Sequence, residues 1–490
     1  MRNRFILPVF LLFILSQPVI LPVSANESSA PWIRVAISTG LASVRLESTG
    51  MSTIHELRSS DPIESFENSH TFNFSLDGNS VRYGNRTADG FTIVLDNTDD
   101  SIEYNGNAYR RLMRVAVVDG KLACINVLPI EEYLYGVVPG EMPVTWNIEA
   151  LKAQAVASRT YAIRQMQENL AEQYDVVSSV YDQVYIGRDG EKDASNQACL
   201  DTWGQICTYN DVPVYAYFHS ASGGWTSDSY TTFGKFYPYL KSVESYDSDA
   251  VVWDFSITAG ALRNLLGANG LSVAFIESIG IEGVDMWGRI TDVSIHHASG
   301  VEILRASEFR RMIGYVNLKS TRFLVNGIEI PGFNELRENS LPEFNGYDFD
   351  KFRYLHPGLI IPIPVESSMD SILVADSEGS LSSLCVMDGS GEVNIPGEEI
   401  FIAVPVTREE LDEFEHVSYA SQNTTSMISN DQNSEIICNA VDGKFTFSGT
   451  GFGHGVGMSQ YGARALADSG WGYNQILMHF YSGIRIEQAW

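Results

Sequence analysis

Residues Leu128–Met166 read LPIEEYLYGVVPGEMPVTWNIEALKAQAVASRTYAIRQM. Within them an apolar run, Tyr133–Val138, leads into a Pro-Gly pair, then Glu141, then Pro143. Proline fixes its own φ angle, and glycine admits backbone conformations that are closed to other residues. We therefore expect a strand that ends in a stiff turn, with the Glu141 carboxylate held on that turn.

A helix is expected after this turn, with Thr145 as its candidate N-cap. One helical stripe carries the apolar residues Ile148, Leu151, Ala155, Ala162 and Met166. Arg159 projects from the edge of that stripe, where a guanidinium requires an anion or a carboxylate as its partner. Two interpretations stay open for each charged residue. Glu141 is either a surface glutamate or a functional acid, and Arg159 is either a structural ion-pair partner or a functional residue.

The same stretch resembles the stage II sporulation protein D family, which includes the amidase enhancers. That family carries the turn YL-x-GV-V-x-x-E-M-P and then the helix A-L-K-A-Q-A-V-A-x-R-T-Y-A, and this chain matches both at Tyr133–Pro143 and Ala150–Ala162. Later family motifs are matched at Gln183–Gly187 (QVYIG), His219–Thr226 (HSASGGWT), Pro238–Val243 (PYLKSV) and Gly453–Ala463 (GHGVGMSQYGA).

The resemblance implies a lytic transglycosylase of bacterial peptidoglycan. Such enzymes act on glycan strands already stripped of stem peptides, cut the MurNAc–GlcNAc bond and leave a 1,6-anhydro end. An ordinary glycosidase uses two carboxylates. Here the 6-hydroxyl of the sugar replaces the second carboxylate, so Glu141 alone is the expected general acid and base. The mechanism requires a raised pKa for this glutamate, and an apolar setting raises the pKa of a carboxyl by desolvation.

Further residues are expected to contact the glycan, and they share positions in the matched motifs: Arg159, Gln183, Tyr185, Ser222, Tyr239, Lys241, His454 and Gln460. A serine nucleophile in the HSASGG motif is disfavoured because no G-x-S-x-G elbow is present. Lys241 as a solvated lysine and Tyr239 as a packed ring remain open alternatives. His454 is either structural or part of the site, and the glycines around it indicate close approach to a ligand or tight packing.

Composition limits the partners. The net charge of −29 and the pI near 4.6 argue against nucleic acid, whose phosphates require Lys and Arg. Some family members place zinc-binding Cys and His before the QVY motif, but Leu170–Asp182 contains neither, so no metal and no cofactor are expected. Five cysteines leave one over in any complete pairing. A Cys199–Cys207 bridge and a Cys385–Cys438 bridge are both left open.

The N-terminus has the pattern of a secretory signal peptide. Arg2 and Arg4 precede the apolar run Phe5–Leu15, and Val23-Ser24-Ala25 supplies a cleavage site after residue 25. An uncleaved membrane anchor is the alternative. No second stretch is long and apolar enough to span a bilayer. We expect an exported protein of the periplasm, the cell wall or the extracellular space.

The predicted fold class is α+β. The expected parts are a signal peptide (1–25), a β-rich N-terminal part of the core (26–125), a catalytic core (126–325), a β-rich insertion (326–441) and a C-terminal part of the core (442–490). The expected partners are peptidoglycan glycan strands, with a cell-wall amidase as a further candidate. Two rival functions remain, a non-catalytic glycan-binding enhancer of an amidase and a secreted scaffold that acts through the insertion.

Overall fold

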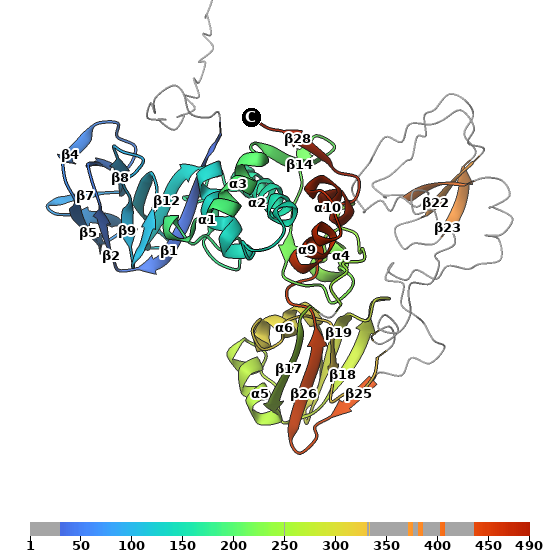
Figure 1. Cartoon of the computed structure of the whole chain (residues 1–490). Coiled ribbons are helices and arrows are strands. Elements are labelled where there is room, and N and C mark those ends of the chain that lie inside the picture. The colour runs from blue at the N-terminus through green and yellow to red at the C-terminus, as the bar shows by residue number, and fades with distance from the viewer. Residues whose placement is uncertain are drawn as a thin grey trace, which may run out of the picture. The chain divides into compact units, whose positions relative to one another are not determined.

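The computed structural model describes residues 30–248, 250–330, 333, 371–375, 381–385, 402–406 and 436–490. It forms two compact units, unit 1 (Met1–Tyr217 and Leu466–Trp490) and unit 2 (Phe218–Ala465). Strands and helices occur in both, which confirms the predicted α+β class (Figure 1). The predicted signal peptide and most of the predicted insertion lie outside the described residues. No helix in the described ranges is long and apolar enough to cross a membrane.

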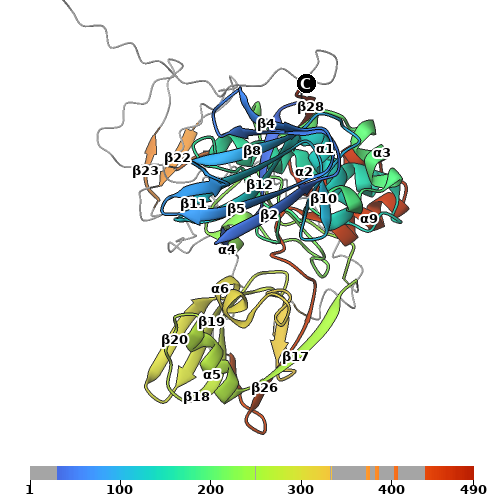
Figure 2. The same ribbon diagram turned by 90° about the vertical axis from the view of Figure 1, so that its left-hand side faces the viewer.

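The N-terminal half of unit 1 consists of two antiparallel sheets, apart from the parallel pairing of β13 with β1. The seven-stranded sheet has the order β13-β1-β12-β11-β8-β3-β4, and the six-stranded sheet has the order β10-β9-β2-β5-β6-β7. Their bounds are β1 Trp32–Leu41, β2 Ser43–Ser48, β3 Ser52–Glu56, β4 Pro62–Phe66, β5 His70–Asp77, β6 Ser80–Tyr83, β7 Arg86–Ala88, β8 Gly90–Leu95, β9 Ile102–Tyr104, β10 Asn107–Tyr109, β11 Leu112–Val118, β12 Lys121–Pro129 and β13 Val176–Val177. Figure 2 shows β8, β11 and β12 side by side. The predicted boundary at residue 125 falls inside β12.

An aromatic cluster fills the space between these two sheets. Phe74 of β5 and Tyr83 of β6 lie in one sheet, and each ring centroid is 5.8 Å from that of Phe91 of β8 in the other sheet. Phe74 and Phe91 are buried, while the alternate residues of β5 are more exposed, which is the period of a half-buried strand. The contact between large aromatic rings therefore holds the sheets face to face.

The rest of unit 1 is mainly helical. It contains α1 (Ile130–Glu141), α2 (Ile148–Glu168), η1 (Arg188–Gly190), α3 (Asp193–Asp201) and α10 (Tyr473–Phe480), with a three-stranded sheet of β15 (Val212–Pro213), β14 (Gln205–Tyr209) and β28 (Arg485–Gln488). The predicted strand at Tyr133–Val138 is wrong, because this run lies within α1. A continuous apolar run has neither the strand nor the helix period, so periodicity cannot decide its type.

The helix α2 begins two residues later than expected. Its N-cap is Asn147, whose side-chain oxygen accepts a hydrogen bond from the Glu149 N–H at 3.1 Å, so the predicted cap at Thr145 is wrong. Pro143 begins a turn that is closed by the Trp146 N–H and the Pro143 carbonyl at 3.1 Å. Thr145 lies inside this turn, and asparagine caps a helix as well as threonine does.

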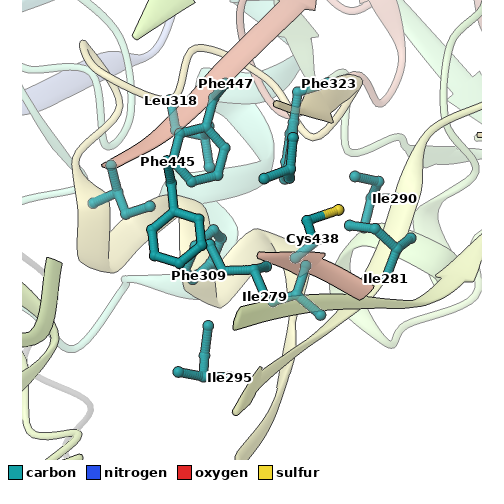
Figure 3. Packing of buried hydrophobic residues seen from close by; sticks show 14 of the residues in the cluster. Ile279, Ile281, Ile290, Ile295, Phe309, Leu318, Phe323, Cys438, Phe445 and Phe447 are labelled. Atoms are coloured by element: carbon teal, nitrogen blue, oxygen red, sulfur yellow. The ribbon is translucent and has the colours of Figure 1, made fainter. Parts of the chain in front are cut away.

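Unit 2 has a hydrophobic core that lies between two sheets and two helices. One sheet has the order β17-β26-β21 and the other β20-β19-β18-β25, and α5 and α6 pack against them. The bounds are β16 Phe218–His219, α4 Ser229–Phe233, β17 Val252–Thr258, α5 Ala259–Ala268, β18 Ile276–Val284, β19 Ile290–His297, β20 Gly300–Arg305, α6 Ala306–Ile313, β21 Phe323–Val325, β25 Ile436–Asn439, β26 Lys444–Thr450, β27 Met458–Ser459 and α9 Gln460–Asp468, whose last three residues belong to unit 1. Figure 3 shows the buried side chains, among them Phe309 and Phe447, whose ring centroids are 6.0 Å apart.

The predicted insertion is partly described. Three short strands, β22 (Ser371–Ala375), β23 (Leu381–Cys385) and β24 (Ile402–Val406), form an antiparallel sheet in the order β23-β22-β24. The end of the predicted range is β25, which pairs with β18. Residues 436–439 therefore belong to the main sheet of unit 2.

A buried ion pair joins α1 to α2. The side chains of Glu131 and Arg159 are both 0% exposed, and their two hydrogen bonds are 2.8 Å and 2.7 Å long. The Gly204 N–H also donates to Glu131, and Arg159 donates to the carbonyls of Cys199 and Gln205. The pair thus fixes α1, α2, the end of α3 and the start of β14 around one centre. Removing a single partner of such a pair leaves a buried charge without compensation.

We expect Glu131→Gln or Arg159→Met alone to lower the free energy of unfolding by about 3–5 kcal/mol. The double variant Glu131→Leu/Arg159→Met removes both charges and is expected to recover most of this loss. Urea denaturation followed by circular dichroism measures the difference. The exposed pair between Arg82 and Asp77 is the control, and Arg82→Gln should change stability by less than about 1 kcal/mol. A double variant as unstable as the sum of the single variants would contradict this account.

Candidate functional site

Glu141 is the last residue of α1 and is partly exposed. Two glycines one helical turn apart, Gly136 and Gly140, form the face of α1 next to it. A Cβ atom on Gly140 would lie 2.5 Å from the Val184 carbonyl oxygen, and one on Gly136 would lie 2.5 Å from the Tyr185 ring. The segment Gln183–Gly187 therefore lies directly against the α1 backbone, an approach that only glycine allows.

This close approach positions the carboxylate of Glu141. The Val184 N–H donates a hydrogen bond to Glu141 Oε1 at 2.6 Å, and the Ile186 N–H donates to the Gly136 carbonyl at 3.2 Å. A hydrogen bond between a backbone amide and a carboxylate favours the ionised acid. The C-terminal end of a helix, where Glu141 lies, disfavours a negative charge. The carboxyl is thus held in one orientation under two opposing electrostatic influences.

Buried tyrosines lie beneath this segment. The Tyr133 hydroxyl donates to Gln183 Oε1 at 3.0 Å, and the Tyr161 hydroxyl donates to Asp182 Oδ1 at 2.6 Å. Burial, together with the nearby carboxylates of Glu141 and Asp182, raises the pKa of Tyr133 well above its ordinary value. Burial and Asp182 likewise raise the pKa of Tyr161. Both phenols stay protonated at neutral pH and serve as hydrogen-bond donors. Tyr133, Tyr161 and Asp182 were not identified as site residues from the sequence.

Three predicted contact residues of unit 1 lie inside the protein. Gln183 is fully buried and donates to the Ser158 carbonyl, and the Tyr185 hydroxyl donates to Asn126 at 2.9 Å. Arg159 is fully buried and pairs with Glu131. Of the two alternatives that the sequence left open for Arg159, the structure shows the structural ion pair. Gln183 and Tyr185 support the segment that carries Val184, so their effect on Glu141 passes through the backbone.

A second polar centre lies in unit 2 around His219. Its Nε2 is 2.7 Å from Ser222 Oγ, and its Nδ1 is 3.2 Å from the Val456 carbonyl. Burial, and after it the neighbours His454 and Arg289, lowers the pKa of His219 well below its ordinary value. The imidazole is therefore neutral, with Nδ1–H donating to Val456 and Nε2 accepting from Ser222. Ser222 is fully buried, so this serine supports the turn and is not exposed for attack on a substrate.

Asp247 organises the same centre and was missed in the sequence. Its buried carboxylate accepts hydrogen bonds from the backbone N–H groups of Ser222 and Gly224 at 2.6 and 2.7 Å. It also accepts from the hydroxyls of Ser245 and Ser459, both at 2.5 Å. Asp247 thus ties the HSASGG turn to the GHGVGMSQ segment. No motif surrounds Asp247, so only its position after the PYLKSV match could have drawn attention to it.

The glycines around His454 serve tight packing, one of the two alternatives left open. A Cβ atom on Gly453 would lie 2.5 Å from His219 Cβ, and one on Gly455 would lie 2.8 Å from Arg289 Cζ. Both glycines have positive φ angles, 123° and 84°, which other residues rarely adopt. Arg289, also missed in the sequence, is buried and donates to the Ser222 carbonyl at 2.8 Å.

His454 has a defined protonation state. Its Nδ1 accepts a hydrogen bond from the Val456 N–H at 3.0 Å, and its ring centroid lies 5.4 Å from that of His219. Loss of hydration, together with the charges of Arg310 and Arg289, lowers the pKa of His454 to about 3. His454 is therefore neutral at physiological pH and cannot act as a cation toward a ligand.

The remaining predicted contacts of unit 2 differ in exposure. Tyr239 and Gln460 are each 7% exposed, whereas the Lys241 side chain is exposed to solvent. Tyr239 stacks on Tyr237 with the ring centroids 5.8 Å apart, as in the packed alternative. A contact of Lys241 or Gln460 with a glycan stays a prediction.

The cysteines and possible metal ligands were also located. Cys199 and Cys207 are free buried thiols, so the bridge considered between them is not formed. Burial raises the pKa of each thiol to about 12. Cys438 is also a free thiol. In the described part of the chain no group of three or more His, Cys, Asp or Glu side chains is placed to hold a metal ion.

Comparisons with known proteins agree with the motifs. Residues 118–209, which include Glu141, match the family described as SpoIID, stage II sporulation protein. An uncharacterized protein of Brachyspira hyodysenteriae is 32% identical over 253 residues, 50% of this chain and 65% of that protein. The amidase enhancer of Bacillus subtilis is 26% identical over 350 residues, 71% of this chain and 39% of the enhancer. Stage II sporulation protein D of the same organism is 39% identical over 136 residues, 25% of this chain and 40% of that protein.

Gly140→Ala tests the close contact that holds Glu141. The added Cβ must displace the Val184 carbonyl, so we expect the bond from Val184 to Glu141 to break and stability to fall by about 1–3 kcal/mol. Hydrogen exchange measured by mass spectrometry should become faster in peptides that cover residues 183–187. Gly260→Ala in α5, where a Cβ meets nothing within 4 Å, is the matched control and should leave these peptides unchanged. Unchanged exchange in Gly140→Ala would exclude the proposed packing.

The low pKa of His454 predicts a loss of stability in acid. The folded protein binds fewer protons than the unfolded chain between the folded pKa of about 3 and the ordinary value of 6.5. The stability contributed by neutral His454 is therefore complete above the ordinary pKa and falls as the pH drops, by about 1.4 kcal/mol per pH unit for one proton. Asn at this position can still accept from Val456. We expect His454→Asn to show a shallower pH slope in urea denaturation between about pH 6 and pH 4. Equal slopes would contradict the assignment.

Proposed function

This chain belongs to the stage II sporulation protein D and amidase enhancer family through its residues 118–209, and we propose that it is a peptidoglycan lytic transglycosylase. Its substrate is the glycan strand without stem peptides, and its product carries a 1,6-anhydro-MurNAc end. The observation that carries the proposal is the placement of Glu141, at the end of α1 and oriented by the Val184 N–H.

One carboxyl group is sufficient for this reaction. In its protonated form Glu141 gives its proton to the glycosidic oxygen as the bond from that oxygen to the MurNAc C1 breaks. The ionised carboxylate then takes the proton of the MurNAc 6-hydroxyl as this oxygen forms its bond to C1. No water is consumed, and Glu141 ends in its starting form. The opposing influences on its charge suit a group that must exist in both forms during one cycle.

Other glutamates of α1 are poorer candidates for this role. Glu131 is fully buried against Arg159 and is out of reach of a polymer. Glu132 pairs with the guanidinium of Arg111 through both of its oxygens. Both carboxylate oxygens of Glu132 are therefore already engaged by the arginine.

The name of one relative favours a second candidate function. The Bacillus subtilis relative is called an amidase enhancer, and the matched region covers 39% of its length. A protein of this kind could hold glycan strands and assist a cell-wall amidase without cutting them. Under either function we propose that the chain is exported and acts at the cell wall.

The test is cleavage of purified glycan strands that lack stem peptides. The wild-type protein is expected to produce 1,6-anhydro-MurNAc ends, detected by mass spectrometry. Glu141→Gln should lower the rate by about 10²- to 10⁴-fold or more, because it removes the general acid. Glu172→Gln changes an exposed glutamate beyond α2 and is the control that should keep full activity.

The outcomes separate the two candidate functions. Loss of products in Glu141→Gln alone, with unchanged circular dichroism, supports the transglycosylase. A folded wild-type protein that binds the strands but yields no products refutes it. In that case the enhancer function predicts faster peptide release when the protein is added to an amidase.

A further inference from the structure

Arg310 is a buried cation that lacks a counter-ion within the described residues. It lies on α6 and is 7% exposed. Its Nε–H donates to the Leu318 carbonyl at 2.9 Å, and its guanidinium lies 4.6 Å from the centroid of the Tyr315 ring. Burial, partly offset by Tyr315, lowers the pKa of Arg310 to about 10, so the group remains charged at neutral pH. A buried charge without an ionic partner is costly, so the lack of a carboxylate partner for Arg310 among the described residues requires an explanation.

A second cation lies on the adjoining segment. The Lys319 ammonium is 5.8 Å from the centroid of the Phe452 ring, and the ring is 36% exposed. This lysine forms no ion pair with a carboxylate in the part of the chain that the structure describes. The Gly453 N–H donates to the Lys319 carbonyl at 2.9 Å. The neighbouring carbonyls of Leu318 and Lys319 therefore connect Arg310 to the Gly453–His454 turn, and both cations belong to one small region of unit 2.

The neutral histidines of this region do not compensate the charge. His219 and His454 are both close enough to Arg310 for its charge to lower their pKa values. The carboxylate of Asp247 is already occupied by four donors from the HSASGG and GHGVGMSQ segments and from Ser245. Among the described residues, the local field around Arg310 and Lys319 is thus positive, and such a field is suited to binding an anion.

Arginine geometry selects the kind of anion. A guanidinium presents parallel N–H groups that match the two oxygens of a carboxylate. In Arg310 the Nε–H is used by Leu318, so the terminal Nη groups provide the parallel pair. N-acetylmuramic acid without its stem peptide carries a free carboxylate on the lactyl group. In a strand that still carries the peptide, this carboxyl is a neutral amide.

We propose that Arg310, together with Lys319 on the adjoining segment, forms a subsite that binds the free lactyl carboxylate of peptide-free N-acetylmuramic acid. This inference rests on the proposed function, since it takes the stripped glycan strand as the ligand. It assigns to unit 2 the selection of stripped strands over strands that carry peptides. The discriminating feature is the charge that appears when the peptide is removed.

The first test needs no substitution in the subsite. Binding is measured with the full-length Glu141→Gln protein, so that cleavage does not consume the strands. One ligand is the peptide-free strand, and the other is the same strand with its lactyl carboxyls converted to methylamides. We expect about tenfold to hundredfold weaker binding of the amidated strand, as for the loss of a charge-assisted bidentate contact. Equal affinity for both strands, or no binding of either strand, overturns the subsite.

Variants in the same background locate the effect. Arg310→Gln should bind both strands with equal affinity, and Arg310→Lys should keep only part of the preference because it loses the parallel donors. Arg311→Gln is the matched control, because Arg311 is the next residue, is half exposed and pairs with Glu308. It should keep the full preference. Should Arg310→Gln fail to fold, Lys319→Gln is the second variant and is expected to reduce the preference by a few-fold. A folded Arg310→Gln that keeps the full preference refutes the assignment.

The subsite and the proposed function can fail separately. Cleavage is read from 1,6-anhydro ends with the wild-type protein, whereas the subsite is read from binding alone. A protein that prefers stripped strands but does not cut them would keep the subsite and refute the transglycosylase. A protein that cuts both kinds of strand and binds them equally would support the transglycosylase and refute the subsite.

Discussion

The ion pair between Glu131 and Arg159 is the contact on which the first unit depends. It lies at the start of α1, and Glu141 ends the same helix ten residues later, about 15 Å away at 1.5 Å per residue. Because the pair fixes the position and rotation of α1 against α2, it also fixes which face of α1 meets the segment Gln183–Gly187. The two glycines of that face then let the backbone approach, and the approach delivers the Val184 N–H to Glu141. A fully buried charge pair thus determines the orientation of a partly exposed acid at the other end of the helix.

The second unit uses buried polar groups in a similar way. Asp247, His219 and Arg289 are nearly inaccessible, and their partners are mostly backbone groups of the HSASGG and GHGVGMSQ segments. Between the short strands β16 and β27 and the start of α9, the two segments lack regular secondary structure, so their backbone groups need such partners. The main role of these buried polar residues is therefore to hold the backbones of the HSASGG and GHGVGMSQ segments in place. Arg310 differs from this set because its side chain makes one hydrogen bond among the described residues, to the Leu318 carbonyl.

The sequence predicts those elements whose apolar residues recur with the spacing of a helix or of a strand. The helix α2 follows from the helical stripe, and the strands between residues 32 and 118 make up the predicted β-rich part of the core. The α1 run lacks both periods because the helix is buried almost all round, and so its type could not be read. Glu141 is identifiable by its motif, but its anchor is a backbone amide 43 residues later, which no side-chain pattern reveals. The partner of Arg159 lies 28 residues earlier, and Asp247 and Arg289 lie outside any motif, because tertiary contacts place them.

Under the proposed function, the charge of the chain restricts how it can recognise an anionic polymer. A protein of net charge −29 repels a strand that carries a carboxylate on every muramic acid. At physiological salt this repulsion is screened over about 8 Å, so it hardly acts on a strand that is already in contact. Recognition must then come from short-range contacts, and a cation used for this purpose must be kept from pairing with the abundant acidic side chains of its own chain. Arg310 is 7% exposed on α6, where it contacts Tyr315 and the Leu318 carbonyl and pairs with no carboxylate among the described residues. The same burial makes the guanidinium interact more strongly with a carboxylate that reaches it, because the local dielectric constant is low.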